Sequence, residues 1–139
     1  MTTPSEKDAS ATVTLDIRPP LTLLGNAALN GYITVARHHK VKTDPHLPAN
    51  AVDLVLMVHV YHELAYPFEM MMKVREALKP GGRVVFVEYR KEDPAVQIKE
   101  VHKMSVEQLK KEMQVVGLLP VKTVETLPLQ HIVIFEKRR

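Results

Sequence analysis

The stretch AVDLVLMVHVYHEL, residues 51–64, decides the fold of this chain. Residues 51–60 form an almost unbroken apolar run without alternation, which is typical of a strand buried on both faces in a parallel sheet. The run then ends in Tyr61, His62 and Glu63, whose polar groups can bind a ligand or move a proton. The sequence therefore predicts a buried strand that presents polar side chains at one end of a sheet.

The residues after this strand predict a helix, a turn and a second buried strand. In PFEMMMKVREALK, residues 67–79, apolar positions recur on one helical face, namely Phe68, Met71, Val74 and Leu78. Pro80 presets a turn and Gly81 tolerates a positive φ, so we expect the helix to end there. RVVFVEY, residues 83–89, follows as another apolar strand. A helix-turn-strand unit of this kind is typical of an α/β fold.

The segment MSVEQLKKEMQVVG, residues 104–117, predicts a further helix. Ser105 and Gln108 have the spacing of a capping box, in which the side chains at the first turn satisfy free backbone N–H groups. Gly117 can adopt the left-handed conformation that commonly ends a helix. Apolar residues recur between these two ends at helical spacing, so one face of the helix should pack on the core.

Two β-rich runs, residues 120–128 and 130–138, close the chain. The turn between them, at Pro128 and Leu129, is very short. Because a short turn can only join antiparallel neighbours, these runs predict a C-terminal antiparallel hairpin.

The N-terminal half predicts a strand, a helix, a second strand and a loop. TVTLDI, residues 12–17, alternates apolar and polar residues and ends near an acid, Asp16. We expect a helix from about 20 to 29, because two prolines can occupy its first turn and leucines recur at helical spacing. YITVA at 32–36 is a strand candidate, and residues 38–50 predict a loop because two prolines and an asparagine interrupt any period.

These residues together resemble a known family. VDLVLMVHVYHEL, the helix after it, LKPGGRVVFVEYR and the hairpin ending HIVIFEKR strongly resemble the second half of the class I S-adenosylmethionine-dependent methyltransferases. TLDIRPPLTLLGNAALNG resembles the family's second strand, its terminal acid and the following helix, so the resemblance covers residues 12–138. It implies a three-layer, Rossmann-like α/β sheet, mostly parallel with a C-terminal antiparallel hairpin, whose cofactor is S-adenosylmethionine.

The resemblance also implies a cofactor site at the carboxyl ends of the parallel strands, where ligands bind in such folds. Asp16 would accept hydrogen bonds from the ribose hydroxyls of the cofactor, although it could instead cap the helix before Pro19. Thr43 and Asp44 lie where the family places a polar or acidic group against the adenine amino group. His59 and Tyr61 would line the methionine or substrate side of the cleft.

Three further residues, Glu88, Tyr89 and Arg90, would extend from the next strand towards the substrate. His62 is a candidate general base on a substrate hydroxyl or amine, because histidine titrates near neutral pH, and Glu63 could orient it. The alternative is that His62 and Glu63 only cap the strand and the next helix. The family often catalyses methyl transfer by positioning the reactants alone.

A metal site built from His59, His62, Glu63 and His102 is conceivable, but no HExxH or comparable ligand spacing supports it. The chain has no cysteine, which excludes thiolate metal sites, disulfides and a cysteine nucleophile. We therefore expect no metal, and interpret the histidines as pocket-lining or surface residues.

One part of the family pattern is missing from this sequence. The family's first strand carries a glycine-rich GxGxG loop that the cofactor approaches closely, and none of the residues before Asp16 is glycine. We therefore expect the domain to lack its first strand, to leave neighbouring strand edges unpaired, and to be impaired in catalysis when alone. The chain could be truncated, another segment or chain could supply the strand, or the remnant could have become a binding module.

Composition limits the other possibilities. The net charge is +3, from 19 Lys and Arg against 16 Asp and Glu, and aromatic residues are 5%, which argues against a nucleic-acid partner despite basic clusters at 37–42 and 137–139. No apolar run reaches the ~20 residues that span a bilayer, and the start lacks a signal-peptide core. We expect residues 1–11 to be a disordered tail and 12–139 to be one domain of a cytoplasmic protein.

Two functions follow from this reading. The first is methyl transfer from S-adenosylmethionine to an acceptor, most simply a small molecule. The alternative is a non-catalytic interaction subunit that pairs through its open sheet edge, either with a second copy or with a partner chain that completes the sheet. A nicotinamide-binding Rossmann domain fits less well, because the glycine fingerprint is absent and the chain ends in a hairpin.

Overall fold

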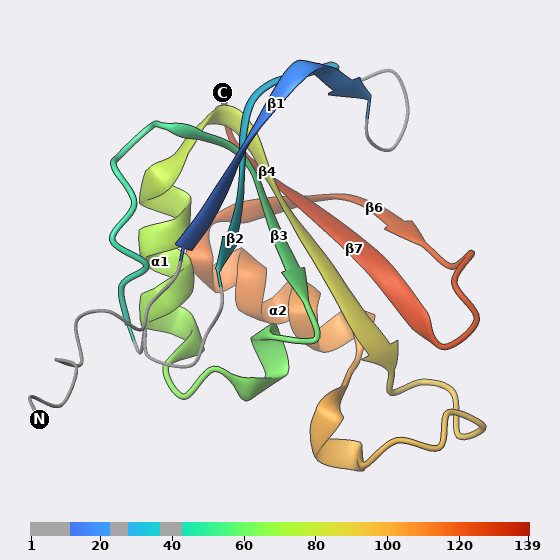
Figure 1. Ribbon diagram of the computed structural model, residues 1–139. Coiled ribbons are helices and arrows are strands. Elements are labelled where there is room, and N and C mark those ends of the chain that lie inside the picture. The colour runs from blue at the N-terminus through green and yellow to red at the C-terminus, as the bar shows by residue number, and fades with distance from the viewer. Residues whose placement is uncertain (1–11, 23–27, 37–42) are drawn as a thin grey trace, which may run out of the picture.

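A computed structural model describes the chain over residues 12–22, 28–36 and 43–139 (Figure 1). Within these ranges the strands form one mixed sheet in the order β1-β2-β3-β4-β7-β6, and the short β5 pairs with β4. The strands are β1 (Thr12–Thr22), β2 (Ala28–Ala36), β3 (Val52–Val58), β4 (Leu78–Arg90), β5 (Lys103–Met104), β6 (Leu118–Val124) and β7 (Gln130–Lys137). The helices are α1 (Pro67–Ala77), α2 (Val106–Val116) and the short 3-10 helices η2 (Tyr61–Glu63) and η3 (Glu100–His102).

The centre of the sheet is parallel and both of its ends are antiparallel. Strands β2, β3 and β4 run parallel, as does the short β5 against β4. At one end β1 pairs antiparallel with β2, and at the other β4, β7 and β6 pair antiparallel. The predicted buried strands around 51–60 and 83–89, their parallel pairing and the C-terminal hairpin are therefore confirmed.

Both described helices lie on one face of the sheet (Figure 1). The main core lies between them and the strands, and its largest fully buried side chains include Phe86, Phe135, Met57, Met71, Leu109 and Met113. The opposite face holds a small buried cluster of Leu54, Val85 and Ile134. In the described residues the architecture is thus two layers, and the predicted three-layer arrangement is wrong for them.

The predicted helix at 20–29 is wrong for its described residues, 20–22 and 28–29, and residues 23–27 lie outside the described ranges. Strand β1 continues through the two prolines to Thr22, and β2 already begins at Ala28. Proline has no N–H to donate, but an outer strand tolerates it. The register shifts between Ile17 and Leu21, the interval that contains both prolines. Pairing with β2 therefore overrides the helical spacing of the leucines.

The pairing of β2 with β3 changes the expectation that strand edges next to the missing first strand are left unpaired. Strand β3 has a neighbour on each side, with Leu54 opposite Ile33 of β2 and opposite Arg83 of β4. A strand from the N-terminal segment thus occupies the place beside β3. The outer strands of the described sheet are β1 and β6. The predicted tail at 1–11 and the basic cluster at 37–42 lie outside the described residues.

Helix α2 follows its local signals, whereas α1 follows them only in part: it ends at Ala77, before the predicted turn at Pro80 and Gly81, which already belongs to β4. The Ser105 side chain accepts a hydrogen bond from the Gln108 N–H at 3.1 Å, and Gly117 ends α2 with a φ of 87°. Helix α1 begins with Pro67 at its first turn, but Phe68 is 48% exposed, so its predicted place on the inner face is wrong. Neither helix is long and apolar enough to cross a bilayer, and no other helix in the described ranges is.

Candidate functional site

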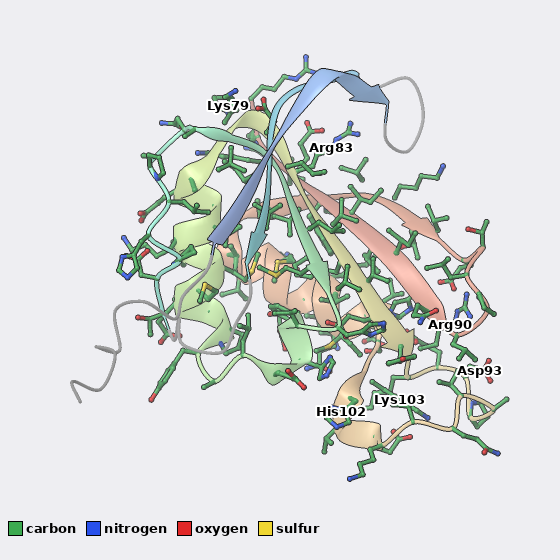
Figure 2. All side chains as sticks on the ribbon, in the orientation of Figure 1. Lys79, Arg83, Arg90, Asp93, His102 and Lys103 are labelled. Carbon is green, nitrogen blue, oxygen red and sulfur yellow. The ribbon has the colours of Figure 1, made fainter. Side chains whose placement is uncertain are left out.

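The carboxyl ends of β3 and β4 bring together residues from three separate segments. The chain leaves β3 into η2, leaves β4 at Arg90, and returns through η3 to the short strand beside β4. Figure 2 shows Arg90, His102 and Lys103 at this end of the sheet, whereas Lys79 and Arg83 lie at the other. Ligands bind at the carboxyl ends of parallel strands in open α/β sheets, so this end is the candidate site.

His62 and Glu88 form the buried centre of the site. Nδ1 of His62 lies 2.6 Å from Oε2 of Glu88, and the two side chains are 5% and 0% exposed. Burial raises the pKa of the Glu88 carboxyl, and the hydrogen bond and charge of His62 partly offset this effect. This contact fixes the orientation of the His62 ring. In the tautomer in which Nδ1–H donates to an ionised Glu88, Nε2 carries the lone pair.

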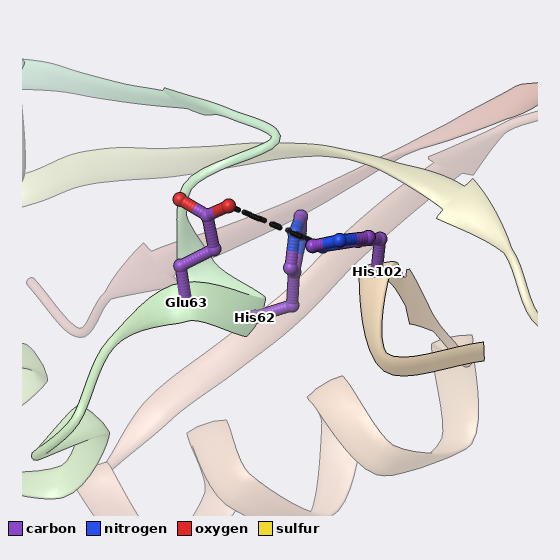
Figure 3. Close-up of side chains that lie close together, drawn as sticks. All are labelled: His62, Glu63 and His102. Carbon is purple, nitrogen blue, oxygen red and sulfur yellow. Dashed lines mark hydrogen bonds and ion pairs between the residues drawn. The ribbon is translucent and has the colours of Figure 1, made fainter. Parts of the chain in front are cut away.

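The outer nitrogen of His62 faces two further ligand atoms. Its Nε2 lies 3.2 Å from Nδ1 of His102 and 3.8 Å from Oε1 of Glu63. Nδ1 of His102 and Oε1 of Glu63 are 4.0 Å apart. Figure 3 shows the three side chains converging from η2 and η3. Glu63 was predicted to orient His62, but the shorter contact to His62 is made by Glu88.

His59 has an unusual backbone at the end of β3. Its φ is 52°, in the left-handed region that non-glycine residues rarely adopt. Strand alternation would direct its side chain to the face of Met57, but its ring stacks on Tyr89 at 4.1 Å between centroids. Burial lowers the pKa of the His59 imidazole, and nearby His62 lowers it further. Left-handed residues of this kind cluster at functional sites.

Tyr61 is part of the core and does not line a cleft. Its side chain is 3% exposed, its ring packs edge-on against Phe86, and its hydroxyl donates to Glu112 of α2. Burial, together with the Glu112 carboxylate, raises the pKa of Tyr61. The structure thus places Tyr61 in the main core, packed on Phe86, and not on the surface of a cleft as predicted.

Arg90 was predicted to extend towards a substrate, but it holds the loop between β6 and β7. Its guanidinium donates to the Glu125 side chain and to three carbonyl oxygens, those of Glu125, Leu127 and Pro128, at 2.6 to 3.0 Å. This loop, residues 125–129, is longer than the predicted turn. Most of the guanidinium's donors are thus used within the protein, so the predicted substrate role is not supported by this geometry. The predicted substrate residue Glu88 is likewise fully buried.

The other predicted cofactor ligands, Asp16, Thr43 and Asp44, precede β3 in the sequence, whereas the residues of the cluster follow it. Asp16 lies within β1, opposite Tyr32, so it does not end a strand as predicted. Its side chain lies outside the described residues. Thr43 and Asp44 lie in the segment before β3 that runs alongside α1 (Figure 1), and Asp44 accepts the His46 N–H at 2.8 Å.

Two buried polar atoms near the ends of β3 and β4 make no hydrogen bond with the described residues. Within the described residues, Nδ1 of His59 and Oε1 of Glu88 are buried without a hydrogen-bond partner. Unpaired buried polar atoms are costly and are retained mainly where a ligand or water satisfies them.

Sequence reasoning missed the role of Glu88 as the partner of His62, and it considered His102 only in a metal site that it set aside for lack of ligand spacing. An acid within an apolar strand was a usable signal for Glu88, because a buried carboxylate requires a partner. His102 carries no such signal, since it lies 40 residues from His62 in the sequence and meets it only through the fold.

Comparisons with known proteins agree with this picture of the fold. A family model described as "Methyltransferase domain" matches residues 2–86. The comparison with curated proteins gave no match.

Several solved structures are similar in fold. An S-adenosylmethionine-dependent methyltransferase from Aquifex aeolicus superimposes with a TM-score of 0.63 at 18% identity, covering 79% of this chain and 54% of that one. A putative type 11 methyltransferase from Sulfolobus solfataricus gives 0.59 at 19% identity, covering 68% and 54%. Human N-acetylserotonin methyltransferase in complex with S-adenosylmethionine gives 0.55 at 15% identity, covering 63% and 30%. The chain thus spans about half the length of the first two structures.

Proposed function

Since the chain belongs to the methyltransferase domain family, we propose that it binds S-adenosylmethionine at the carboxyl ends of β3 and β4 and methylates a small-molecule acceptor. The observation that carries this proposal is the hydrogen bond between His62 and Glu88 at these strand ends. It places a basic ring nitrogen, oriented by a buried carboxylate, where the fold locates its ligands.

The residues that would hold the cofactor follow from the resemblance and from the unpaired atoms of the site. By the resemblance, Asp16 would bind the ribose and Thr43 and Asp44 would contact the adenine. The register supports the last two more than Asp16, because Asp16 pairs with Tyr32, which precedes the Ile33 opposite Leu54 and so lies level with the amino end of β3. His59 would bind near the methionine end, because its buried Nδ1 needs a partner. When bound, S-adenosylmethionine supplies a methyl group that its positive sulfur already activates.

His62 would deprotonate the acceptor. Its Nε2 can accept the proton of a hydroxyl or amine, and Glu88 stabilises the charged ring that results, since it accepts the Nδ1–H at 2.6 Å. The low exposure of both side chains limits water at this point, which strengthens their interaction. The remaining contribution of the protein is to align acceptor and methyl group.

A second candidate is a non-catalytic subunit that pairs through a sheet edge. One observation favours it: the sequence given contains no GxGxG loop, the segment that the cofactor approaches closely in the family. The outer strands β1 and β6 would provide the pairing edge, to a second copy or to a partner chain.

Calorimetric titration with S-adenosylhomocysteine tests the proposal. We expect the purified chain to bind it with a dissociation constant in about the micromolar range. The variant Asp16→Asn should lose binding, because an amide cannot accept two ribose hydroxyls equally. Glu136→Gln is the matched control, since Glu136 pairs with Arg83 at 3.1 Å on β7, which β2, β3 and β4 separate from β1, and it should bind as the unchanged chain does.

The same preparation separates catalysis from binding. With a panel of small hydroxyl and amine acceptors, His62→Gln should bind S-adenosylhomocysteine but form none of it from S-adenosylmethionine. A folded chain that binds no cofactor analogue would contradict the proposal. A stable oligomer that is indifferent to Asp16→Asn would favour the second candidate.

A further inference from the structure

We propose that His62, Glu63 and His102 bind a divalent first-row transition metal ion, with Zn²⁺ as the best-matched example. One ligand atom from each residue lies within 4.8 Å of the others. These atoms are Nε2 of His62, Nδ1 of His102 and Oε1 of Glu63 (Figure 3). Two imidazoles and a carboxylate are the ligand set of many three-ligand zinc sites.

The distances suit a shared ion. Bonds of about 2.0–2.2 Å from zinc to nitrogen or oxygen place two tetrahedral ligands about 3.4 Å apart. The three separations here are 3.2, 3.8 and 4.0 Å. Adjustments of less than about 1 Å would therefore close the site around an ion. His102 and Glu63 can make them, because their side chains are 42% and 37% exposed.

The fixed member of the site is His62, and Glu88 fixes it. In the tautomer that metal binding requires, Nδ1–H donates to the buried Glu88 carboxylate and the lone pair of Nε2 is directed at His102 and Glu63; the ion would replace the contact between Nε2 and Nδ1 of His102. Metal-binding histidines almost always have such a carboxylate or carbonyl partner on their other nitrogen. Two carboxylates, one binding and one supporting, also balance the charge of a divalent ion.

The ligand types define the class of ion. Imidazole suits Zn²⁺, Co²⁺, Ni²⁺ and Fe²⁺, whereas Ca²⁺ and Mg²⁺ prefer oxygen ligands throughout. The exposed side of His102 and Glu63 gives the ion a path from solvent. Three protein ligands also leave a position open for an exogenous ligand.

Metal binding does not depend on methyl transfer, but it would change how an acceptor is activated. With an ion bound, Nε2 of His62 is a ligand and cannot serve as a base. An acceptor hydroxyl in the open position would then lose its proton more readily because the ion lowers its pKa.

The test is calorimetric titration of the metal-free chain with Zn²⁺, without any nucleoside ligand. We expect one site, weakened at least about 10-fold in His102→Ala and in His102→Gln. Glu88→Gln should weaken Zn²⁺ binding about 10- to 100-fold, although Glu88 supports His62 and is not itself a ligand of the ion. His46→Ala is the matched control, because His46 is exposed and lies beside Asp44, and it should bind Zn²⁺ as the unchanged chain does.

A second readout tests the geometry. Co²⁺ should give the intense visible absorption of a four-coordinate ion in the unchanged chain and in His46→Ala, and not in His102→Ala. Equal Zn²⁺ affinity in the unchanged chain and in His102→Ala would overturn the proposal. The adjacent histidines His38 and His39 are a rival site, and binding that is lost only when both are replaced by alanine would also overturn it. Thermal melting without metal confirms that each variant is folded. A chain that binds Zn²⁺ but not S-adenosylhomocysteine upholds this site and contradicts the proposed methyl transfer.

Discussion

At the scale of single residues, His131 is the clearest case of a polar group whose state is set by burial. It lies opposite Glu88 on the neighbouring strand and is 1% exposed, and neither ring nitrogen has a hydrogen-bond partner among the described residues. Burial lowers the pKa of the His131 imidazole, although the carboxylates of Glu92 and Glu125, 3.8 and 4.0 Å away, oppose the shift. His131 is therefore a neutral ring in the core.

This burial predicts a pH dependence of stability. Because the pKa of His131 is lower in the folded chain than its ordinary 6.5, the unfolded chain binds more protons below that pH. The free energy of unfolding should thus fall as the pH drops from 6.5 through the lower folded value. In His131→Leu the fall between about pH 7.5 and 5.5 should be smaller, as measured by urea denaturation.

The control for this change is His46→Leu, since His46 is largely exposed. It should keep the full pH dependence. A pH dependence in His131→Leu equal to that of the unchanged chain would show that His131 protonates equally well in both states. His59 has a lowered pKa for the same reason, so some pH dependence should remain.

At the scale of elements, α2 shows how local signals and the site are connected. Its first turn is capped by Ser105, its buried face consists of Leu109, Met113 and Val116, and its second turn holds Glu112 against Tyr61 of η2. The helix thus packs on the main core and braces the segment that carries His62. Its stability should depend on the cap as well as on the core contact.

Ser105→Ala should lower the free energy of unfolding by about 1 kcal/mol, because the Gln108 N–H would lose its acceptor. Val115→Ala on the same helix is the matched control. Val115 is 71% exposed, so its change should be within about 0.5 kcal/mol. Chemical denaturation of both variants measures the difference, and equal values would show that the cap contributes little.

At the scale of the whole molecule, the core depends on contacts between segments far apart in sequence. Phe86 of β4 is fully buried, and its ring makes edge-on contacts with Tyr61 and with Phe135 of β7, at centroid distances of 5.0 and 5.7 Å. One ring therefore connects the site segment, the central strand and the hairpin. The opposite face has only a small buried cluster in the described residues.

Phe86→Ala should lower the free energy of unfolding by about 3–5 kcal/mol, a large part of the about 5–15 kcal/mol that a domain of this size has. Phe68→Ala is the control, because Phe68 is 48% exposed on α1 and its loss leaves no cavity. Denaturant midpoints compare the two. If Phe68→Ala were as damaging as Phe86→Ala, the one-sided core described here would be wrong.

The sequence by itself determined the elements whose signals are local. The apolar run before Tyr61, the cap at Ser105 and the left-handed Gly117 each depend on neighbouring residues, and the structure has all three as predicted. Parallel pairing of the buried strands and the antiparallel hairpin also followed from runs and turns. The family followed from the same motifs, because they are the residues that build the sheet and its turns.

Only the tertiary structure decided the rest, because the deciding contacts are between distant residues. Glu88 lies 26 residues from His62 and His102 lies 40 residues from it, and no periodicity relates such positions. The left-handed backbone of His59, which places its ring on Tyr89, likewise depends on the strand next to it. Among the described residues of the predicted helix at 20–29, Leu21 pairs with Leu29 and Thr22 with Ala28, so an antiparallel partner satisfies backbone groups there in place of helical hydrogen bonds.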